Sequence, residues 1–306
     1  TTQGIDDLVS LLKSTDIDVL YNSLKVLGEL EDSTASSSVI LLLRHETEDL
    51  AALAAEVLGK FGDPANVPAL LARYEASAGP RIKASLLSSL SRLARSTDPL
   101  QDVLAQALGD TDSRVRANAV ECFERLRMPS ATRFLLPLLS DEDNRVRANV
   151  LKALWETHDR EKLIQSLESM IEDPNRWMRA SAAFVLQHIE VENRLERLSR
   201  LLQDEDRDVK KAAWRAVCSL ETPQTIPVWL QYLHDNKEED LPLIQGKIDK
   251  LAHDAIDPIL TLAAARSDLS PLAQKLFDRI EDRAWQEEGW WSWLQLKKKR
   301  FFSPEK

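Results

Sequence analysis

Apolar residues recur along the chain at helical spacing, in blocks that polar turns interrupt. In one block, "SATRFLLPLL" places four apolar residues on one face of a helix: Phe134, Leu135, Leu138 and Leu139. The polar turn "SDEDN" follows, and "RVRANVLKALWET" then resumes the helical spacing. No alternating strand pattern of useful length appears, so we expect an all-α protein built from pairs of helices.

The same block returns along the chain with a nearly constant period. The apolar residue of "RVR", which we call the register residue, recurs in steps of 31, 32 and 31 residues at Val115, Val146, Met178 and Val209. Earlier units place Val19, Leu50 and Ile82 at this position, and agreement is weaker after residue 240. About nine units therefore cover the chain from about Gly4 to about Asp282.

Two further patterns keep this register. A short polar residue stands three positions before the register residue, where it can cap the second helix of the pair, at Asp16, Asp112, Asp143, Asn175 and Asp206. The register residue and the residues four and eight positions later are apolar in the central units: Val115, Ala119 and Phe123; Val146, Val150 and Leu154; Met178, Ala182 and Leu186; Val209, Ala213 and Val217. This spacing predicts one buried stripe on each second helix.

The turns "DTDSRVRANA", "DEDNRVRANV" and "DEDRDVKKAA", with "KVLGEL" and "EVLGKFG" ending the first two units, resemble the short form of the HEAT repeat. The resemblance implies a right-handed α-solenoid, or superhelix, of about nine helix pairs over residues 1–284, followed by a Trp-rich, basic cap or tail at 285–306. It also implies a ladder between neighbouring units, in which a basic row pairs with the Asp row in the turns. The basic row holds Lys83, Arg116, Arg147, Arg179 and Lys210.

Composition narrows the choice of partner. The chain of 306 residues carries a formal net charge of -10, which disfavours nucleic acid as the main partner. Cys122 and Cys218 stand far apart inside predicted helices, where we expect them to behave as small apolar residues in a reducing, cytoplasmic compartment. The sequence has no apolar run long enough to predict a transmembrane segment.

Motifs for chemistry do not fit the repeat. Four His-acid pairs invite comparison with the iron-binding HEAT-like deoxyhypusine hydroxylase, but they occupy non-equivalent register positions: His45, His158, His234 and His253. The acidic turns lack the loop of a calcium site. HEAT-like DNA glycosylases and phycobilin lyases remain alternatives as enzymes, the former because of Trp155, Trp177 and Trp214. We otherwise expect no catalytic residues, metal or cofactor.

The remaining candidates lie on the predicted surface of the second helices. Positions six and nine past the register residue are expected to point away from the buried stripe, and they hold Glu121, Glu124, Lys152, Trp155, Phe184, Gln187 and Arg215. Trp155 and Phe184, with Trp177 beside them, form the predicted anchor for a partner, unless these rings fold back onto the junctions between repeats. Arg114, Arg145, Lys152 and Arg215 complete the predicted partner-binding set.

The last segment, "DRAWQEEGWWSWLQLKKKRFFSPEK", breaks the repeat. It either caps the open end of the solenoid or contacts an anionic membrane surface through Trp290, Trp291, Trp293, Lys297, Lys298, Lys299 and Arg300. The sequence therefore predicts a noncatalytic scaffold or adaptor that binds a protein or peptide on its concave face. A membrane-associated regulatory module, at the cytoplasmic membrane face, is the alternative.

Overall fold

A computed structural model describes residues 2–77, 79–94, 100–157, 159–220, 222–235, 244–247, 271, 275 and 278. These residues form helices joined by short turns, and no strand occurs among them. The chain divides into two compact units, residues 1–170 and 171–306, which we describe separately.

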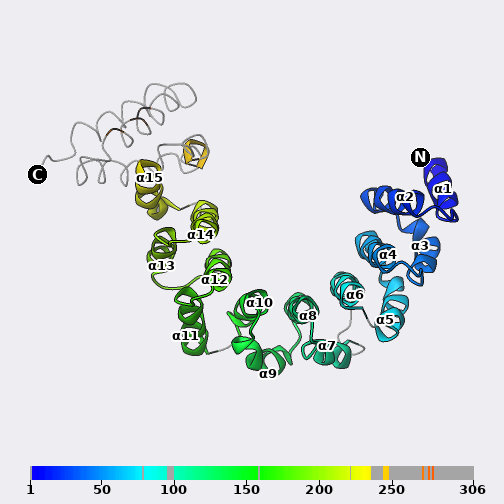
Figure 1. Ribbon diagram of the computed structural model, residues 1–306, viewed down its shortest axis with the longest axis horizontal. Coiled ribbons are helices and arrows are strands. Elements are labelled where there is room, and N and C mark those ends of the chain that lie inside the picture. Colours follow the sequence, from blue (N-terminus) through cyan, green and yellow to red (C-terminus); the bar gives the residue numbers. More distant parts are fainter. Residues whose placement is uncertain are drawn as a thin grey trace, which may run out of the picture. The chain divides into compact units, whose positions relative to one another are not determined.

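The first unit contains eleven of the described α-helices, in the order of Figure 1. They are α1 (Thr2–Leu11), α2 (Ile17–Leu30), α3 (Ser36–Leu42), α4 (Glu48–Phe61), α5 (Val67–Glu75), α6 (Pro80–Leu93), α7 (Gln101–Ala107), α8 (Ser113–Arg125), α9 (Ala131–Leu135), α10 (Asn144–Leu154) and α11 (Arg160–Ile171), the last of which ends one residue beyond the unit. Short 3-10 turns lie at Ser33–Ala35, Pro64–Asn66 and Leu136–Ser140. The second unit contains the helices α12 (Arg176–His188), α13 (Arg194–Leu202), α14 (Arg207–Ser219) and α15 (Ile226–Asp235). A 3-10 turn at Pro223–Thr225 lies between α14 and α15.

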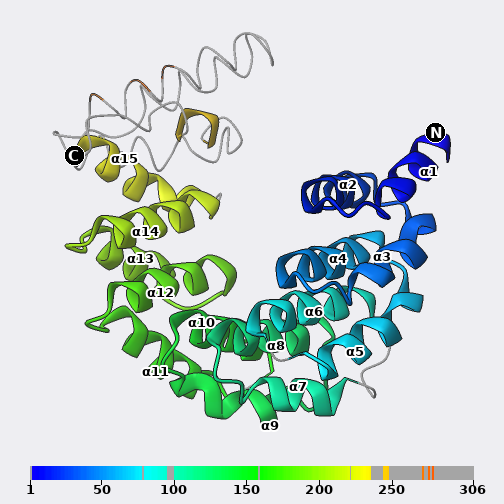
Figure 2. The ribbon, with the colours of Figure 1, turned by 45° about the vertical axis from the view of Figure 1, so that its right-hand side comes forward.

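Helix pairs in series make up both units. In the first unit, the second helices α2, α4, α6, α8 and α10 form an inner row along its curve, and α1, α3, α5, α7 and α9 form an outer row (Figures 1 and 2). Each second helix packs on the next, as α4 does on α6 and α6 on α8. In the second unit α12 packs beside α14, and α13 contacts both. The predicted all-α solenoid of helix pairs is confirmed.

One predicted helix is interrupted. The segment at residues 130–139 forms α9 and then a tighter 3-10 turn over Leu136–Ser140. Pro137 lies at the start of this turn and has no backbone N–H with which to continue the α-helical bonding.

The predicted caps are present at the start of each of these second helices. Asp143 Oδ1, for example, accepts the N–H groups of Arg145 and Val146 at 2.9 and 3.1 Å. Side chains also accept N–H bonds at the other four predicted positions: Asp16, Asp112, Asn175 and Asp206. The twelve stripe residues of the central units are all buried. The register therefore sets both where a second helix begins and which face it buries.

The ladder between repeats uses a different aspartate from the one expected. Arg116 Nε and Nη2 bind the two carboxylate oxygens of Asp141 at 2.9 and 2.8 Å. Arg179 binds Asp204 in the same way at 2.7 and 2.9 Å. Both acids lie five positions before the next register residue, whereas the predicted acids lie three positions before it. The predicted pairing is therefore wrong: the first aspartate of the turn lies within reach of the preceding repeat, whereas the second lies over the N-terminus of its own helix.

Each "DxD" turn thus divides two tasks between its aspartates. Asp141 accepts the guanidinium of the preceding repeat, and its Oδ1 also accepts the N–H of Asp143 at 2.9 Å. Arg116 in turn donates to the carbonyl oxygens of Asp110 and Thr111 in its own turn, at 3.0 and 3.2 Å. One guanidinium therefore links two successive turns.

The ladder begins only at the third repeat. Lys83 Nζ lies 3.1 Å from Asp110 Oδ2 and makes its first rung. In the first two repeats the equivalent residues are Leu20 and Ala51, which are buried. The earliest repeats therefore place apolar side chains where the later ones place a cation.

The last residue of each "RVRAN" also belongs to the scaffold. Asn118 Nδ2 donates to Ala84 O at 2.8 Å, across the junction from α8 to α6. Asn149 Nδ2 makes the equivalent bond from α10 to Ala117 O at 3.4 Å, and also donates to Glu121 Oε1 at 2.9 Å. The asparagines satisfy carbonyl groups of the neighbouring helix.

Position nine past the register residue lies at the junction between second helices. Gly59 occupies it in the second repeat, and a Cβ added there would lie 3.0 Å from Ser89 Cα on α6. Ser89 Oγ donates to Ala55 O at 2.8 Å across this close approach. The expectation that position nine faces solvent is therefore wrong, because the next repeat covers it.

We predict that the two aspartates of one turn respond differently to amide substitution. Asp141→Asn should lower the free energy of unfolding by about 3 kcal/mol, because it removes the charge that binds the buried Arg116 guanidinium and leaves only the exposed Glu142, whose Oε1 lies 3.8 Å away. Asp143→Asn should change it by less than about 0.5 kcal/mol, because asparagine caps helices as well as aspartate does. Urea denaturation of both variants measures the difference, and equal losses would contradict the division of tasks.

We also predict a loss of stability in acid. Hydrogen bonds from the Arg114 side chain lower the pKa of Asp112 from 3.8 to about 2 in the folded protein. A lowered pKa stabilises the folded state above the unfolded value and loses this contribution as the pH falls from about 5 to about 2. The urea midpoint should fall over this range, and it should fall less in Asp112→Asn, which retains a capping oxygen. Parallel curves for the two proteins would show that Asp112 contributes nothing.

Candidate functional site

Two exposed aromatic rings lie on one face of α12. Trp177 is 50% exposed and Phe184 is 39% exposed. They stand seven residues apart, which is close to two helical turns, so their side chains leave the helix in similar directions. Large apolar side chains with this exposure are rare in the described part of the second unit, where these are the two examples.

Polar neighbours hold both rings in place. The Arg176 guanidinium carbon lies 4.6 Å from the centroid of the Trp177 ring, and its Nη1 lies 3.1 Å from Asp206 Oδ2 on the next turn. The ring of His188 lies 4.3 Å from that of Phe184, and His188 Nδ1 lies 2.8 Å from Phe184 O. Each aromatic side chain therefore has a polar neighbour that limits its motion.

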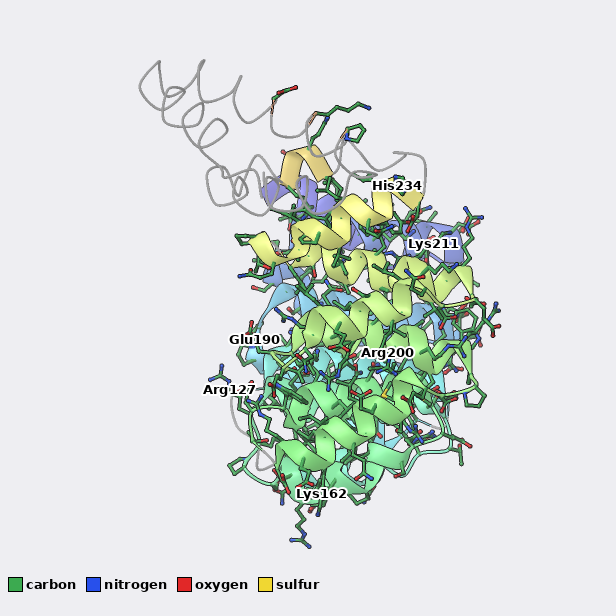
Figure 3. The ribbon with its side chains drawn as sticks, turned by 90° about the vertical axis from the view of Figure 1, so that its left-hand side faces the viewer. Arg127, Lys162, Glu190, Arg200, Lys211 and His234 are labelled. Carbon is green, nitrogen blue, oxygen red and sulfur yellow. The ribbon has the colours of Figure 1, made fainter. Side chains whose placement is uncertain are left out.

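Basic side chains stand on the adjacent second helix. Arg215 holds the same register position on α14 as Phe184 does on α12, and it is exposed. Lys211 lies one turn earlier and is also exposed (Figure 3). Because α12 and α14 pack side by side, we name the surface formed by Trp177, Phe184, His188, Lys211 and Arg215 the α12–α14 patch.

Trp155, the third predicted anchor, is not part of an exposed surface. It is 2% exposed and occupies position nine past the register residue, which is a junction position. The Arg160 guanidinium carbon lies 4.8 Å from its ring centroid. The prediction that Trp155 meets a partner is therefore wrong, and its indole contributes to the core instead.

The other predicted partner-binding residues of the first unit are three cations, and two of them already bind a carboxylate. Lys152 Nζ lies 3.1 Å from Glu124 Oε2, so a carboxylate already compensates its charge. Arg114 is exposed but binds Asp112 through Nε and Nη2, at 3.0 and 2.7 Å. Arg145 is exposed on α10. All three side chains belong to the first unit.

The histidines and cysteines stand apart from one another. His45 Nδ1 accepts the Thr47 N–H at 3.1 Å, just before α4, and His234 lies at the exposed end of α15 (Figure 3). His158 and His253 lie outside the described residues. Within those residues, no group of three or more His, Cys, Asp or Glu side chains is placed to hold a metal. Burial raises the pKa of the Cys122 thiol to about 12, and its Sγ donates to Leu87 O at 3.1 Å.

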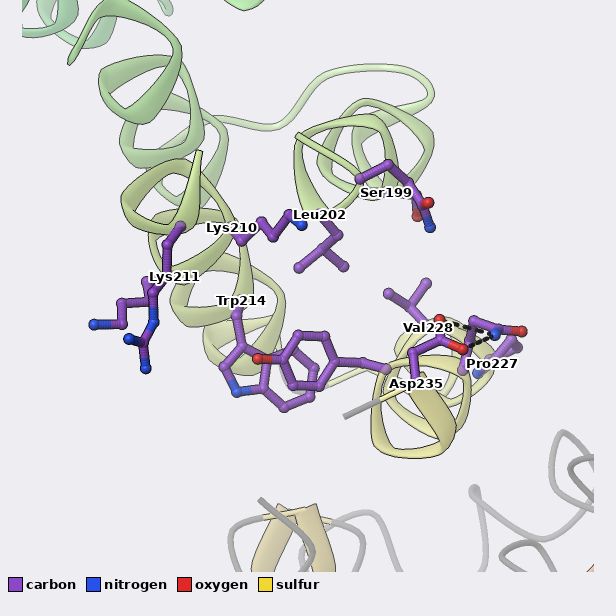
Figure 4. A pocket seen from close by; sticks show the side chains of 12 residues that line it. Ser199, Leu202, Lys210, Lys211, Trp214, Pro227, Val228 and Asp235 are labelled. Carbon is purple, nitrogen blue, oxygen red and sulfur yellow. Dashed lines mark hydrogen bonds between the residues drawn. The ribbon is translucent and has the colours of Figure 1, made fainter. Parts of the chain in front are cut away.

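A pocket that the sequence did not predict lies between α13, α14 and α15. Its volume is about 740 Å³, and the ring of Trp214 stacks on that of Tyr232 at 3.7 Å along one side (Figure 4). Lys210 and Leu202 line another side, and Gln231 Nε2 donates to Asp235 Oδ1 at 2.9 Å at the edge. The ring pair joins two repeats, so the pattern within one repeat could not reveal it.

The predicted tail site cannot be placed. Residues 285–306, with the Trp and Lys residues assigned to it, lie outside the described residues, and so its role as a cap or a membrane contact stays a prediction. Among the helices that are described, none is long and apolar enough to cross a membrane.

Stacked helix pairs, with a repeated cap and a repeated bond between turns, define an α-solenoid repeat protein. The family model described as HEAT repeats matches residues 5–91, 101–187 and 161–241, which together cover more than half of the chain. The chain belongs to the HEAT-repeat family.

Solved structures share this fold at low identity. Importin beta is 16% identical, with a TM-score of 0.52, over 98% of this chain and 49% of its own length. The Escherichia coli protein YibA is 19% identical, with a TM-score of 0.50, over 81% and 92% of the two chains. Kap121p, solved bound to Pho4p, is 13% identical with a TM-score of 0.50, over 95% and 36%. This chain therefore spans about half the length of importin beta and a smaller share of Kap121p. The sequence matches no curated protein at a significant level.

We predict that the two tryptophans contribute very differently to stability. Trp155→Ala should lower the free energy of unfolding by about 3 to 5 kcal/mol, because it empties a large buried volume. Trp177→Ala should change it by less than about 0.5 kcal/mol, since its ring is half exposed. Urea denaturation followed by far-ultraviolet circular dichroism measures both. A larger loss for Trp177→Ala than for Trp155→Ala would contradict the assignment.

Proposed function

We propose that this protein is a noncatalytic scaffold that binds a protein or peptide partner through the α12–α14 patch. The observation that carries the proposal is the pair of restrained, exposed rings of Trp177 and Phe184 on one face of α12. Aromatic residues of this kind supply most of the affinity at protein interfaces, provided that the partner excludes water from them.

The chemistry of the patch indicates what the partner offers. Apolar side chains would cover the two rings, and carboxylates would meet Lys211 and Arg215 on α14. Arg176 is already bound to Asp206, so its contribution is to support the Trp177 ring rather than to attract the partner. An amphipathic segment with an acidic flank fits this arrangement.

The fold is consistent with such a role. HEAT repeats give the chain rows of exposed residues on successive second helices, and the similarly folded Kap121p was solved bound to Pho4p. Because each repeat adds a few exposed positions, a partner can be held by several helices at once.

We predict that removing the two rings abolishes partner capture. The double variant Trp177→Ala/Phe184→Ala should weaken binding by about 30-fold or more, because loss of two interface anchors exceeds about 2 kcal/mol. Affinity capture from cell extract, with mass spectrometry of the retained proteins, identifies the partner, and titration with that protein measures the change.

A matched control is available on α2. Tyr21 and Val26 are 38% and 41% exposed, so Tyr21→Ala/Val26→Ala removes a similar amount of exposed apolar surface elsewhere. The control should retain the partner. Capture of the same proteins by wild type and both double variants would mean that the α12–α14 patch is not the binding site.

A further inference from the structure

A second, chemically different groove lies on the first unit. It has a volume of about 400 Å³ and is lined by residues of three consecutive second helices, α4, α6 and α8. Four of its lining residues are cations, Lys60, Arg81, Arg92 and Arg114, and Glu56 is the one acid among them. We name this surface the α4–α6–α8 groove.

The cations fall into two rows by register. Arg81 and Arg114 stand one position before the register residue, and each already has a carboxylate partner. Arg81 Nη1 lies 2.5 Å from Asp49 Oδ1, and Arg114 Nη2 lies 2.7 Å from Asp112 Oδ2. This row is therefore largely neutralised by the protein itself.

The other row stands ten positions past the register residue, in the last turns of the three helices. It consists of Lys60 on α4 and Arg92 on α6, which line the groove, and Arg125, which holds the same register position on α8 outside the lining. All three side chains are exposed. Across the described residues, no ion pair or hydrogen bond of these three side chains is found. In a chain whose net charge is -10, these three cations, with Glu56 as the single acid of the groove lining, make a local surplus of positive charge.

The centre of the groove carries hydroxyl groups and a single carboxylate. On α6 the residues between the two rows are Ser85 and Ser88, and neither is charged. Ser85 Oγ donates to Glu56 Oε1 at 3.0 Å, which partly satisfies the only acid of the lining. Hydroxyl groups beside cations can serve as donors or acceptors to a peptide backbone.

The spacing of the row selects the conformation of the ligand. Neighbouring packed helices lie about 8 to 10 Å apart, so the three cations are expected about one interhelical distance from each other. A polyproline II peptide has three residues per turn and advances about 3.1 Å per residue, so every third side chain lies on the same face, about 9 Å from the last. Carboxylates at every third residue of such a chain would match Lys60, Arg92 and Arg125 in turn.

We propose that the row of Lys60, Arg92 and Arg125, in and beside the α4–α6–α8 groove, binds an acidic segment of a partner protein in polyproline II conformation, with carboxylates three residues apart meeting the three cations in turn. This site goes beyond the α12–α14 patch, which belongs to the other unit and is proposed to bind apolar side chains over its two aromatic rings. A cation in the last turn of a helix also favours the helix dipole, so the test must separate binding from stability.

The experiment uses three synthetic peptides of about ten residues, of which the first two are matched in composition. The first carries Glu at every third position, the second carries the same Glu residues in one adjacent block, and the third replaces Glu with Gln. Fluorescence anisotropy at low ionic strength measures their binding to the full chain. We expect the first peptide to bind best and the Gln peptide not to bind.

The variants place the site. Lys60→Gln/Arg92→Gln/Arg125→Gln should weaken binding of the first peptide by at least about tenfold, since three ion pairs are lost. The control Arg81→Gln/Arg114→Gln removes two cations of the same groove that are already paired, and it should weaken binding by less than about threefold. Unfolding midpoints of both variants check the fold, and the single variant Arg92→Gln serves if the triple variant is destabilised.

Three results would overturn the proposal. The first is equal binding of the periodic and block peptides, which would indicate attraction without register. The second is unchanged binding by the triple variant and by Arg92→Gln. The third is equally effective competition by a single-stranded oligonucleotide of the same charge, which would assign the groove to polyanions in general. None of these measurements depends on the partner of the α12–α14 patch, so the two proposals fail separately.

Discussion

The guanidinium that bridges two successive turns is the interaction on which this array depends. Arg116 is almost buried, and it binds Asp141 of the next repeat while also donating to the carbonyls of its own turn. Such a buried pair is stable only when geometry and remaining hydrogen bonds are satisfied together. Asp143 of the same turn caps α10. One short acidic turn therefore both begins a helix and binds it to the preceding repeat.

The positions that the scaffold uses decide which residues remain exposed for binding. Within a second helix, the register residue and those four and eight positions later are buried, and positions seven and nine meet the adjacent helices. The positions left to vary are one before, six past and ten past the register residue. Trp177, Phe184 and Arg215 occupy such positions in one unit, and Lys60, Arg92 and Arg125 occupy them in the other. Both proposed surfaces are thus built from the residues that the scaffold does not need.

The sequence predicted the features that lie within a single repeat and missed those that depend on the contact between two repeats. The caps at Asp112 and Asp143 and the stripe through Val146 follow from a period close to 31 residues. The choice of ladder acid did not follow, because either aspartate of "DED" is a plausible partner until the distance across the junction is known. Trp155 was misplaced for the same reason: helical spacing identifies the face away from its own core, but not the face that the next repeat covers.

The first two repeats lack a cation at the ladder position, and this changes how their junctions respond to the solution. Leu20 and Ala51 hold the place that Lys83, Arg116 and Arg179 hold later, and apolar contacts do not change with proton or salt concentration as ion pairs do. Acid or high salt therefore weakens the ladder from the third repeat onward, whereas the first two repeats have no ladder ion pair to lose. The two ends of the ladder thus differ in how strongly the bonding between their turns depends on the solution.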